Sequence, residues 1–145
     1  MFVFRMHDPR FPTFDTKGAA LHGGRWHSRG VHVIYTAEHA SLAVLETVIH
    51  ASGDELPRRS LTRVHIPDGF PIEAAPWIEF PLSQHFGDQW VAEVRSAVLR
   101  VESIAVNRME SNFVLNPRHP EFSRIEHEAP KPFQFDPRFF RGAAS

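Results

Sequence analysis

The chain has 145 residues, no cysteine and a formal net charge of −1. This length is typical of one domain, and a hydrophobic content of 42% is typical of a globular protein. The lack of cysteine excludes disulfides and thiolate metal sites, and the near-neutral charge gives no long-range attraction to DNA or an acidic membrane. We find no signal peptide and no apolar run of the roughly 18 residues that a membrane helix needs, so we expect a cytoplasmic protein.

The first third of the chain predicts two strands and a helix. Residues 2–6 alternate in polarity and predict a strand, and the next fifteen or so residues are predicted as loop. Residues 31–35 predict a second strand, with Val31, Val33 and Tyr35 on one face and His32 and Ile34 on the other. Thr36 is expected to cap a helix that runs to about His50, with Glu38 in its first turn.

The remainder predicts more strands than helices. Residues 61–66 alternate as a strand, and residues 67–82, with four prolines, are expected to be irregular. A second helix is expected to begin near Asp88, with a buried face formed by Val91, Val94 and Val98. Further strands are expected at 101–106, at 112–115 and, on a weaker signal, at 133–135, and the tail from Pro130 is expected to pack across the sheet edge. The fold class is α+β (mixed α/β), in a single compact domain.

Glu46 is an unusual residue for its position. It lies four residues after Leu42 and three before Ile49, on or beside the apolar stripe of the first long helix. A carboxylate there loses hydration and must find a cation or hydrogen-bond donors. Arg25 is the natural candidate for that cation, and a cationic substrate is the other; the simpler interpretation is a structural ion pair.

The stretch GGRWHSRG at 23–30 and the end of the following strand could form a ligand site. Tyr35 ends its strand just before a helix, where α/β folds tend to bind ligands, although a core aromatic would also suit this position. Gly23 and Gly24 permit close approach of a ligand to the backbone, but glycine pairs also form ordinary turns. The stretch lacks the Walker and GxGxxG patterns, and the ten histidines lack zinc-site spacing, so we expect no catalytic metal.

Three blocks of the chain resemble, in order, the successive blocks of the RES domain. These blocks are GGRWHSRGVHVIYTAEHASLAVLETVIH, FGDQWVAEVRSAVLRVES and NFVLNPRHPEF. The likeness runs from FVFRM to PFQFDPRFF, so we assign residues 1–145 to one RES domain. The resemblance implies a fold like that of ADP-ribosyltransferases.

The resemblance also implies a function. RES-domain proteins are toxins of bacterial type II toxin–antitoxin systems that act on NAD. The expected activity is cleavage of the nicotinamide–ribose bond by hydrolysis or phosphorolysis, which depletes NAD and arrests growth. The alternatives are ADP-ribosylation of a specific protein, or a non-catalytic interaction module with the same fold. The implied partner is an Xre-type helix-turn-helix antitoxin through which DNA is bound, with a toxin dimer as a possible part of a larger hetero-oligomer.

The resemblance implies two sets of site residues. The expected catalytic residues are Arg25, Tyr35, Glu46 and Ser103. The expected substrate-binding residues are Arg5, Gly24, His27 and Asn112. Two positions depart from the family pattern, since His27 stands where an asparagine is common and Glu102 where a proline is common.

The chemistry of NAD cleavage suits these residue types. Breaking the bond generates an oxocarbenium-like ribosyl centre, and nicotinamide leaves as a neutral molecule. The Arg25 guanidinium could bind the diphosphate, and the Glu46 carboxylate could stabilise the cation or orient an attacking water. Tyr35 could stack on the nicotinamide ring, while Ser103 and Asn112 could hold the amide or the ribose. We therefore expect Arg25, Tyr35 and Glu46 to meet in one pocket.

Overall fold

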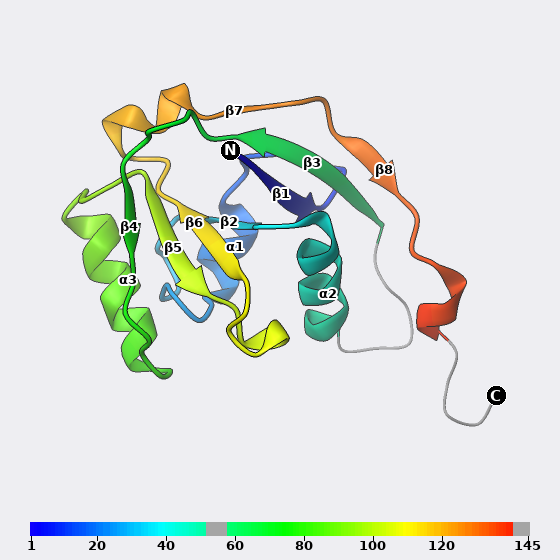
Figure 1. Ribbon diagram of the computed structural model, residues 1–145, viewed down its shortest axis with the longest axis horizontal. Coiled ribbons are helices and arrows are strands. Elements are labelled where there is room, and N and C mark those ends of the chain that lie inside the picture. The colour runs from blue at the N-terminus through cyan, green and yellow to red at the C-terminus, as the bar shows by residue number, and fades with distance from the viewer. Residues whose placement is uncertain (52–57, 141–145) are drawn as a thin grey trace.

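The computed structural model describes residues 1–51 and 58–140, which form one curled, eight-stranded sheet with helices packed against it (Figure 1). The sheet order is β4-β5-β6-β2-β1-β3-β7, and β8 also pairs with β3. Only the β4–β5 pair is parallel among these strands. The strands are β1 (Phe2–His7), β2 (Ile34–Ala37), β3 (Arg59–His65), β4 (Ile72–Ala74), β5 (Val98–Glu102), β6 (Ser111–Leu115), β7 (Glu126–His127) and β8 (Lys131–Phe133).

Three α-helices and three short 3-10 turns complete the described chain. The helices are α1 (Lys17–His22), α2 (Ala40–His50) and α3 (Leu82–Ala92), and the turns are η1 (Ile104–Val106), η2 (Pro120–Arg124) and η3 (Pro137–Phe140). In Figure 1, α3 lies beside β4 and β5, whereas α2 lies near β1 and β2, which are inner strands of the sheet. No helix in the described ranges has the length and apolar character needed to cross a membrane.

The sheet buries apolar side chains on both faces. The strand expected at residues 31–35 is instead β2 at Ile34–Ala37, so Tyr35 is its second residue and does not end it. Ile34 packs with Val3 and Leu115 in one cluster. Val33 and Tyr35 belong to a second cluster with the fully buried Trp90 of α3. Because side chains alternate along a strand, these two clusters cover opposite faces. A third, smaller cluster places α2 against β1.

The second long helix begins six residues earlier than expected, and two of its predicted buried residues lie outside it. The helix starts at Leu82, directly after Pro81, and ends at Ala92. Val91 is buried as predicted, but Val94 has φ 51° beyond the helix end, and Val98 begins β5. The prolines of residues 67–82 were interpreted as breakers, yet proline is well tolerated where a helix starts.

Other boundaries also differ from the sequence-based ones. Thr36 is not a helix cap, because it lies inside β2, where its hydroxyl donates to the carbonyl oxygen of Phe113. His39 is the N-cap residue of α2, so Glu38 precedes the helix. The expected strand at 101–106 is instead β5 followed by η1, and the expected strand at 133–135 is β8. Helix α1 and strand β4 formed in segments predicted to be irregular, while β8 confirms that the tail joins the sheet edge.

Helix α3 touches the loop that follows α1 at very close range. A Cβ atom added at Gly87 would lie 1.7 Å from the carbonyl oxygen of Trp26. Only glycine can occupy this position without displacing one of the two backbones. The close approach fixes α3 against the segment that carries Arg25.

We predict that Gly87→Ala lowers the free energy of unfolding by at least about 2 kcal/mol, because the methyl group must push the two backbones apart. Gly18→Ala is the matched control, since a Cβ at Gly18 in α1 meets nothing within 4 Å. That control should be neutral or stabilising by up to about 1 kcal/mol. Urea denaturation of both variants measures the difference, and equal stabilities would contradict the assignment.

Candidate functional site

A cavity of about 660 Å³ lies among α2, the loop after α1 and the ends of β5 and β6. Seven of the eight residues expected at the site line it: Gly24, Arg25, His27, Tyr35, Glu46, Ser103 and Asn112. Arg5 does not. The volume is within the range of small-molecule and cofactor sites. The fold therefore brings together side chains that are separated by up to 88 positions in the sequence.

Two neutral donors hold the carboxylate of Glu46. The hydroxyl of Ser103 donates to Oε1 at 2.8 Å, and the side-chain amide of Asn112 donates to the same oxygen at 3.0 Å. The second oxygen, Oε2, lies 3.5 Å from Nε2 of His50, whose side chain is 78% exposed. Helix α2 supplies the carboxylate, while the segment after β5 and strand β6 supply the donors. Glu46 thus keeps a defined orientation, with 26% of its side chain exposed.

Arg25 is not the ion-pair partner of Glu46, so the structural pair considered from the sequence does not form. Across residues 1–51 and 58–140, the basic side chain within ion-pair distance of Glu46 is His50, which is a cation only when protonated, and Arg25 has no carboxylate at that distance. Arg25 Nη2 donates a long bond of 3.4 Å to the carbonyl oxygen of Ile78. Its Nε is buried without any hydrogen-bond partner in the described structure. One wall of the cavity therefore carries an unneutralised cation.

Polar side chains of α3 hold the loop that carries Arg25. The hydroxyl of Ser83 donates to the carbonyl oxygen of Arg25 at 2.7 Å, and the side-chain amide of Gln84 donates to that of Gly24 at 2.9 Å. Asp88 accepts from the backbone N–H of Ser28 at 2.8 Å and from its hydroxyl at 2.5 Å. Sequence reasoning missed these residues, because it began the helix near Asp88 and left Ser83 and Gln84, which lie between that start and the irregular segment at 67–82, without an assigned element.

The hydroxyl group of Tyr35 is bonded inside the protein, so its ring is the part available to a ligand. His27 Nε2 lies 2.7 Å from the carbonyl oxygen of Ala19, which can only accept, so Nε2 carries a proton. In the neutral imidazole, Nδ1 then accepts the hydroxyl proton of Tyr35 at 2.7 Å. The same hydroxyl oxygen accepts from the N–H of Trp26 at 3.2 Å, and burial raises the pKa of Tyr35.

Gly24 is required beside this pair of rings. A Cβ at Gly24 would lie 2.9 Å from the Tyr35 hydroxyl oxygen and 2.9 Å from Cε1 of His27. His27 itself is 1% exposed. His27, one of the two residues that depart from the family pattern, is therefore a buried support of the Tyr35 side chain.

Arg5 lies apart from the large cavity. Its guanidinium donates to the carbonyl oxygens of Thr13, Asp15 and Tyr35, at 2.5, 3.2 and 3.0 Å. Burial lowers its pKa to about 10. These bonds tie the loop after β1 to β2. Arg5 also lines a smaller cavity of about 160 Å³, which shares Tyr35, Glu46, His50 and Asn112 with the large one.

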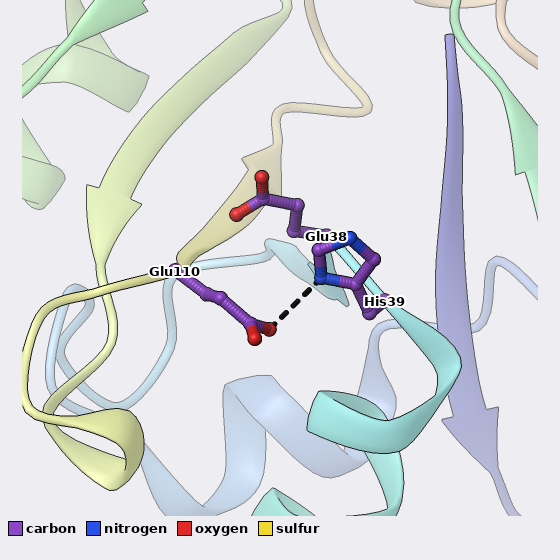
Figure 2. A group of neighbouring side chains, drawn as sticks. All are labelled: Glu38, His39 and Glu110. Carbon is purple, nitrogen blue, oxygen red and sulfur yellow. Dashed lines mark hydrogen bonds and ion pairs between the residues drawn. The ribbon is translucent and has the colours of Figure 1, made fainter.

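A group of potential metal ligands lies at the start of α2, outside the residues that line the large cavity. Glu38, His39 and Glu110 offer one ligand atom each, and these atoms lie within 4.8 Å of one another (Figure 2). Nδ1 of His39 pairs with Glu110 at 2.9 Å, while Glu38 accepts from the backbone N–H of Ser111 at 2.7 Å. In the structure, these contacts join the start of α2 to β6.

We predict that His27→Ala lowers the free energy of unfolding by about 1–3 kcal/mol, because the buried hydroxyl of Tyr35 loses its acceptor. The matched control is His85→Ala, since His85 is exposed on α3. That control should change stability by less than about 0.5 kcal/mol. Chemical denaturation measures both variants, and a loss no greater than that of the control would show that the His27–Tyr35 bond contributes nothing.

Comparison with known proteins gives a family assignment. The family model of the RES domain matches residues 2–136. The chain is 35% identical over 139 residues to the Prs ADP-ribosylating toxin of Sphingobium sp. (strain YBL2), covering 87% of this chain and 86% of that protein. It is 32% identical over 151 residues to Toxin Res of Yersinia enterocolitica, covering 95% of this chain and 99% of that protein.

The fold is also shared with a solved structure. A chain in the crystal structure of the M. tuberculosis MbcT–MbcA toxin–antitoxin complex superposes with a TM-score of 0.71 at 13% sequence identity. The match covers 91% of this chain and 83% of that one. This likeness confirms the single mixed α/β domain expected from the sequence. The family match and the relatives together show that the chain belongs to the RES-domain family.

Proposed function

We propose that this protein is the toxin of a toxin–antitoxin pair, and that it cleaves the nicotinamide–ribose bond of NAD. The acceptor is water or inorganic phosphate. The observation that carries this proposal is the single cavity lined by Arg25, Tyr35, Glu46, Ser103 and Asn112, with a free cation on one wall and an anchored carboxylate on another. Loss of cellular NAD would then arrest growth.

The cavity offers a suitable group for each part of NAD. Arg25 has no carboxylate partner in the described ranges, so its guanidinium is available to bind diphosphate oxygens. Gly24 leaves room for the backbone of its loop to approach the ligand. The ring of Tyr35 lines the cavity and can stack on nicotinamide. The hydrogen bond from its hydroxyl group to His27 holds the ring in place.

Glu46 is suited to stabilise the reacting sugar. When the bond from ribose C1′ to the nicotinamide nitrogen breaks, its electron pair stays on that nitrogen and nicotinamide leaves neutral. Positive charge develops on the ribosyl group, and a carboxylate nearby stabilises it. The oxygen of water or phosphate then forms a bond to C1′, and a proton from water passes to Glu46 or to solvent. Ser103 and Asn112 hold the carboxylate through neutral donors, which leaves its charge in place.

The smaller cavity beside Glu46 supports a small acceptor. It measures about 160 Å³ and shares the Glu46 side chain with the large cavity. A water molecule occupies about 30 Å³ of liquid, so this space accommodates several waters or one phosphate ion.

ADP-ribosyl transfer to a protein is the second candidate function. It is favoured by the relative from Sphingobium, which is described as an ADP-ribosylating toxin and is 35% identical to this chain. The same cavity would bind NAD, and only the acceptor would differ. A non-catalytic interaction module would instead release no nicotinamide at any protein concentration.

We further propose that an Xre-type helix-turn-helix antitoxin neutralises this protein by covering the cavity. The similar fold in the MbcT–MbcA toxin–antitoxin complex supports an antitoxin partner. Ile49 and Ile104 line the cavity and are 55% and 53% exposed, so apolar side chains are accessible beside it. With a net charge of −1, the chain would reach DNA through the antitoxin. A toxin dimer within a larger complex is part of this proposal.

We predict that Glu46→Gln lowers the rate of nicotinamide release from NAD by about a hundredfold or more, because the neutral amide no longer stabilises the developing cation. Arg25→Ala should raise the KM for NAD by removing the diphosphate contact. The matched control is Glu126→Gln, an exposed carboxylate on β7, which should keep the parental rate. Chromatographic assay of nicotinamide measures all three variants, and a parental rate for Glu46→Gln would overturn the assignment.

We predict that NAD labelled on its adenylate half gives free ADP-ribose, or its phosphorylated form when phosphate is present. The small cavity beside Glu46 is where we expect either acceptor to bind. Mass identification of the products with and without phosphate distinguishes water from phosphate. Gel analysis of the same reaction with cell extract tests the second candidate, because a discrete labelled protein without soluble product would favour transfer.

A further inference from the structure

The ring of Trp77 contacts two arginines, Arg25, which lines the cavity, and Arg108, which lies outside its lining. The guanidinium carbon of Arg25 lies 5.2 Å from the centroid of the Trp77 ring, and that of Arg108 lies 4.2 Å from it. Both distances are within the range of a cation–π interaction. Trp77 itself lies in the segment between β4 and α3 and does not line the cavity.

Arg25 differs from every other arginine that stacks on an aromatic ring in the described structure. Five of these six arginines also pair with a carboxylate: Arg10 with Asp8, Arg63 with Glu128, Arg95 with Glu73, Arg108 with Glu102, and Arg124 with Glu121. Arg25 has only the ring of Trp77 and the long bond to Ile78. An aromatic face orients a guanidinium without neutralising its charge.

The second arginine ties the same ring to the loop that carries Ser103. Asn107 and Arg108 have φ values of 55° and 67°, so the loop turns through two residues in the left-handed region. The N–H of Arg108 donates to the carbonyl oxygen of Ser103 at 2.7 Å. Its side chain pairs with Glu102 at 2.5 Å. Glu102, which departs from the family pattern, thus holds Arg108 over Trp77.

We propose that Trp77 is a positioning residue that fixes the Arg25 guanidinium for a diphosphate ligand. Its contact with Arg108 joins the wall that carries Arg25 to the wall that carries Ser103, the residue that donates to Glu46. This inference rests on the proposed function, because it presumes that Arg25 binds the diphosphate of NAD. The buried Nε of Arg25 lacks a partner, so few other contacts hold this side chain when Trp77 is removed.

The test compares the affinities of the whole protein for two ligands by calorimetry. ADP-ribose contains the diphosphate, and nicotinamide does not. Trp77→Ala should weaken ADP-ribose binding by roughly five- to thirty-fold, the range expected from loss of a cation–π contact, with nicotinamide affinity unchanged. Trp77→Phe keeps an aromatic face and should restore binding to within about threefold of the parent. Arg108→Ala leaves the tryptophan in place and should weaken ADP-ribose binding by a smaller factor in the same direction.

Phe11→Ala is the matched control, because Phe11 is another partly exposed ring under an arginine, Arg10, outside the large cavity. It should bind ADP-ribose like the parent. Parental ADP-ribose affinity in Trp77→Ala, or an equal loss of nicotinamide affinity, would overturn the role of Trp77 while leaving the proposed function standing. Failure of the parent itself to bind ADP-ribose would overturn both.

Discussion

The site depends on how the fold satisfies one carboxylate on a partly apolar helix. Glu46 must have partners because α2 packs its neighbours Leu42 and Ala43 against the sheet. One oxygen accepts from the hydroxyl of Ser103 and the amide of Asn112, both neutral, and the other lies 3.5 Å from the exposed His50. A structural arginine in their place would cancel the negative charge that the proposed reaction requires. Because Ser103 and Asn112 are neutral, they orient the Glu46 carboxylate without cancelling its negative charge.

The positive charge of the Arg25 guanidinium is also left without a neutralising partner in the described structure. Arg25 lies on a loop that α3 clamps through backbone contacts to Ser83, Gln84 and Asp88, and the guanidinium itself is left without a carboxylate in the described structure. Rigidity thus comes from the main chain of the loop, and the charge stays available. Between these two walls, His27 fixes the hydroxyl of Tyr35 and presents its ring. Binding sites are most precise when their side chains are supported in this way.

Two kinds of feature could be predicted from the sequence: the strands and helices that follow a local hydrophobic pattern, and the site residues that follow from the family resemblance. Alternation in residues 31–35 placed Ile34 and Tyr35 on opposite faces, although the strand spans Ile34–Ala37, and seven of the eight expected site residues line one cavity. The Arg25–Glu46 pair was a wrong interpretation, because complementary charges in a sequence reveal nothing of competing neutral donors. Gly87, Ser83 and Trp77 could not be found from the chain alone. Their roles depend on contacts between segments about 50 to 60 residues apart in the sequence. The start of α3 was also missed, because the prolines before Leu82 were interpreted as marking an irregular segment.

The central claim is that Arg25, Tyr35 and Glu46 surround one dinucleotide. A crystal structure of the protein with ADP-ribose and nicotinamide bound together tests it most directly. We predict that the diphosphate lies against the guanidinium of Arg25, nicotinamide against the ring of Tyr35, and ribose C1′ beside the Glu46 carboxylate. Ligand bound elsewhere on the protein, with this cavity filled by water alone, would contradict the account.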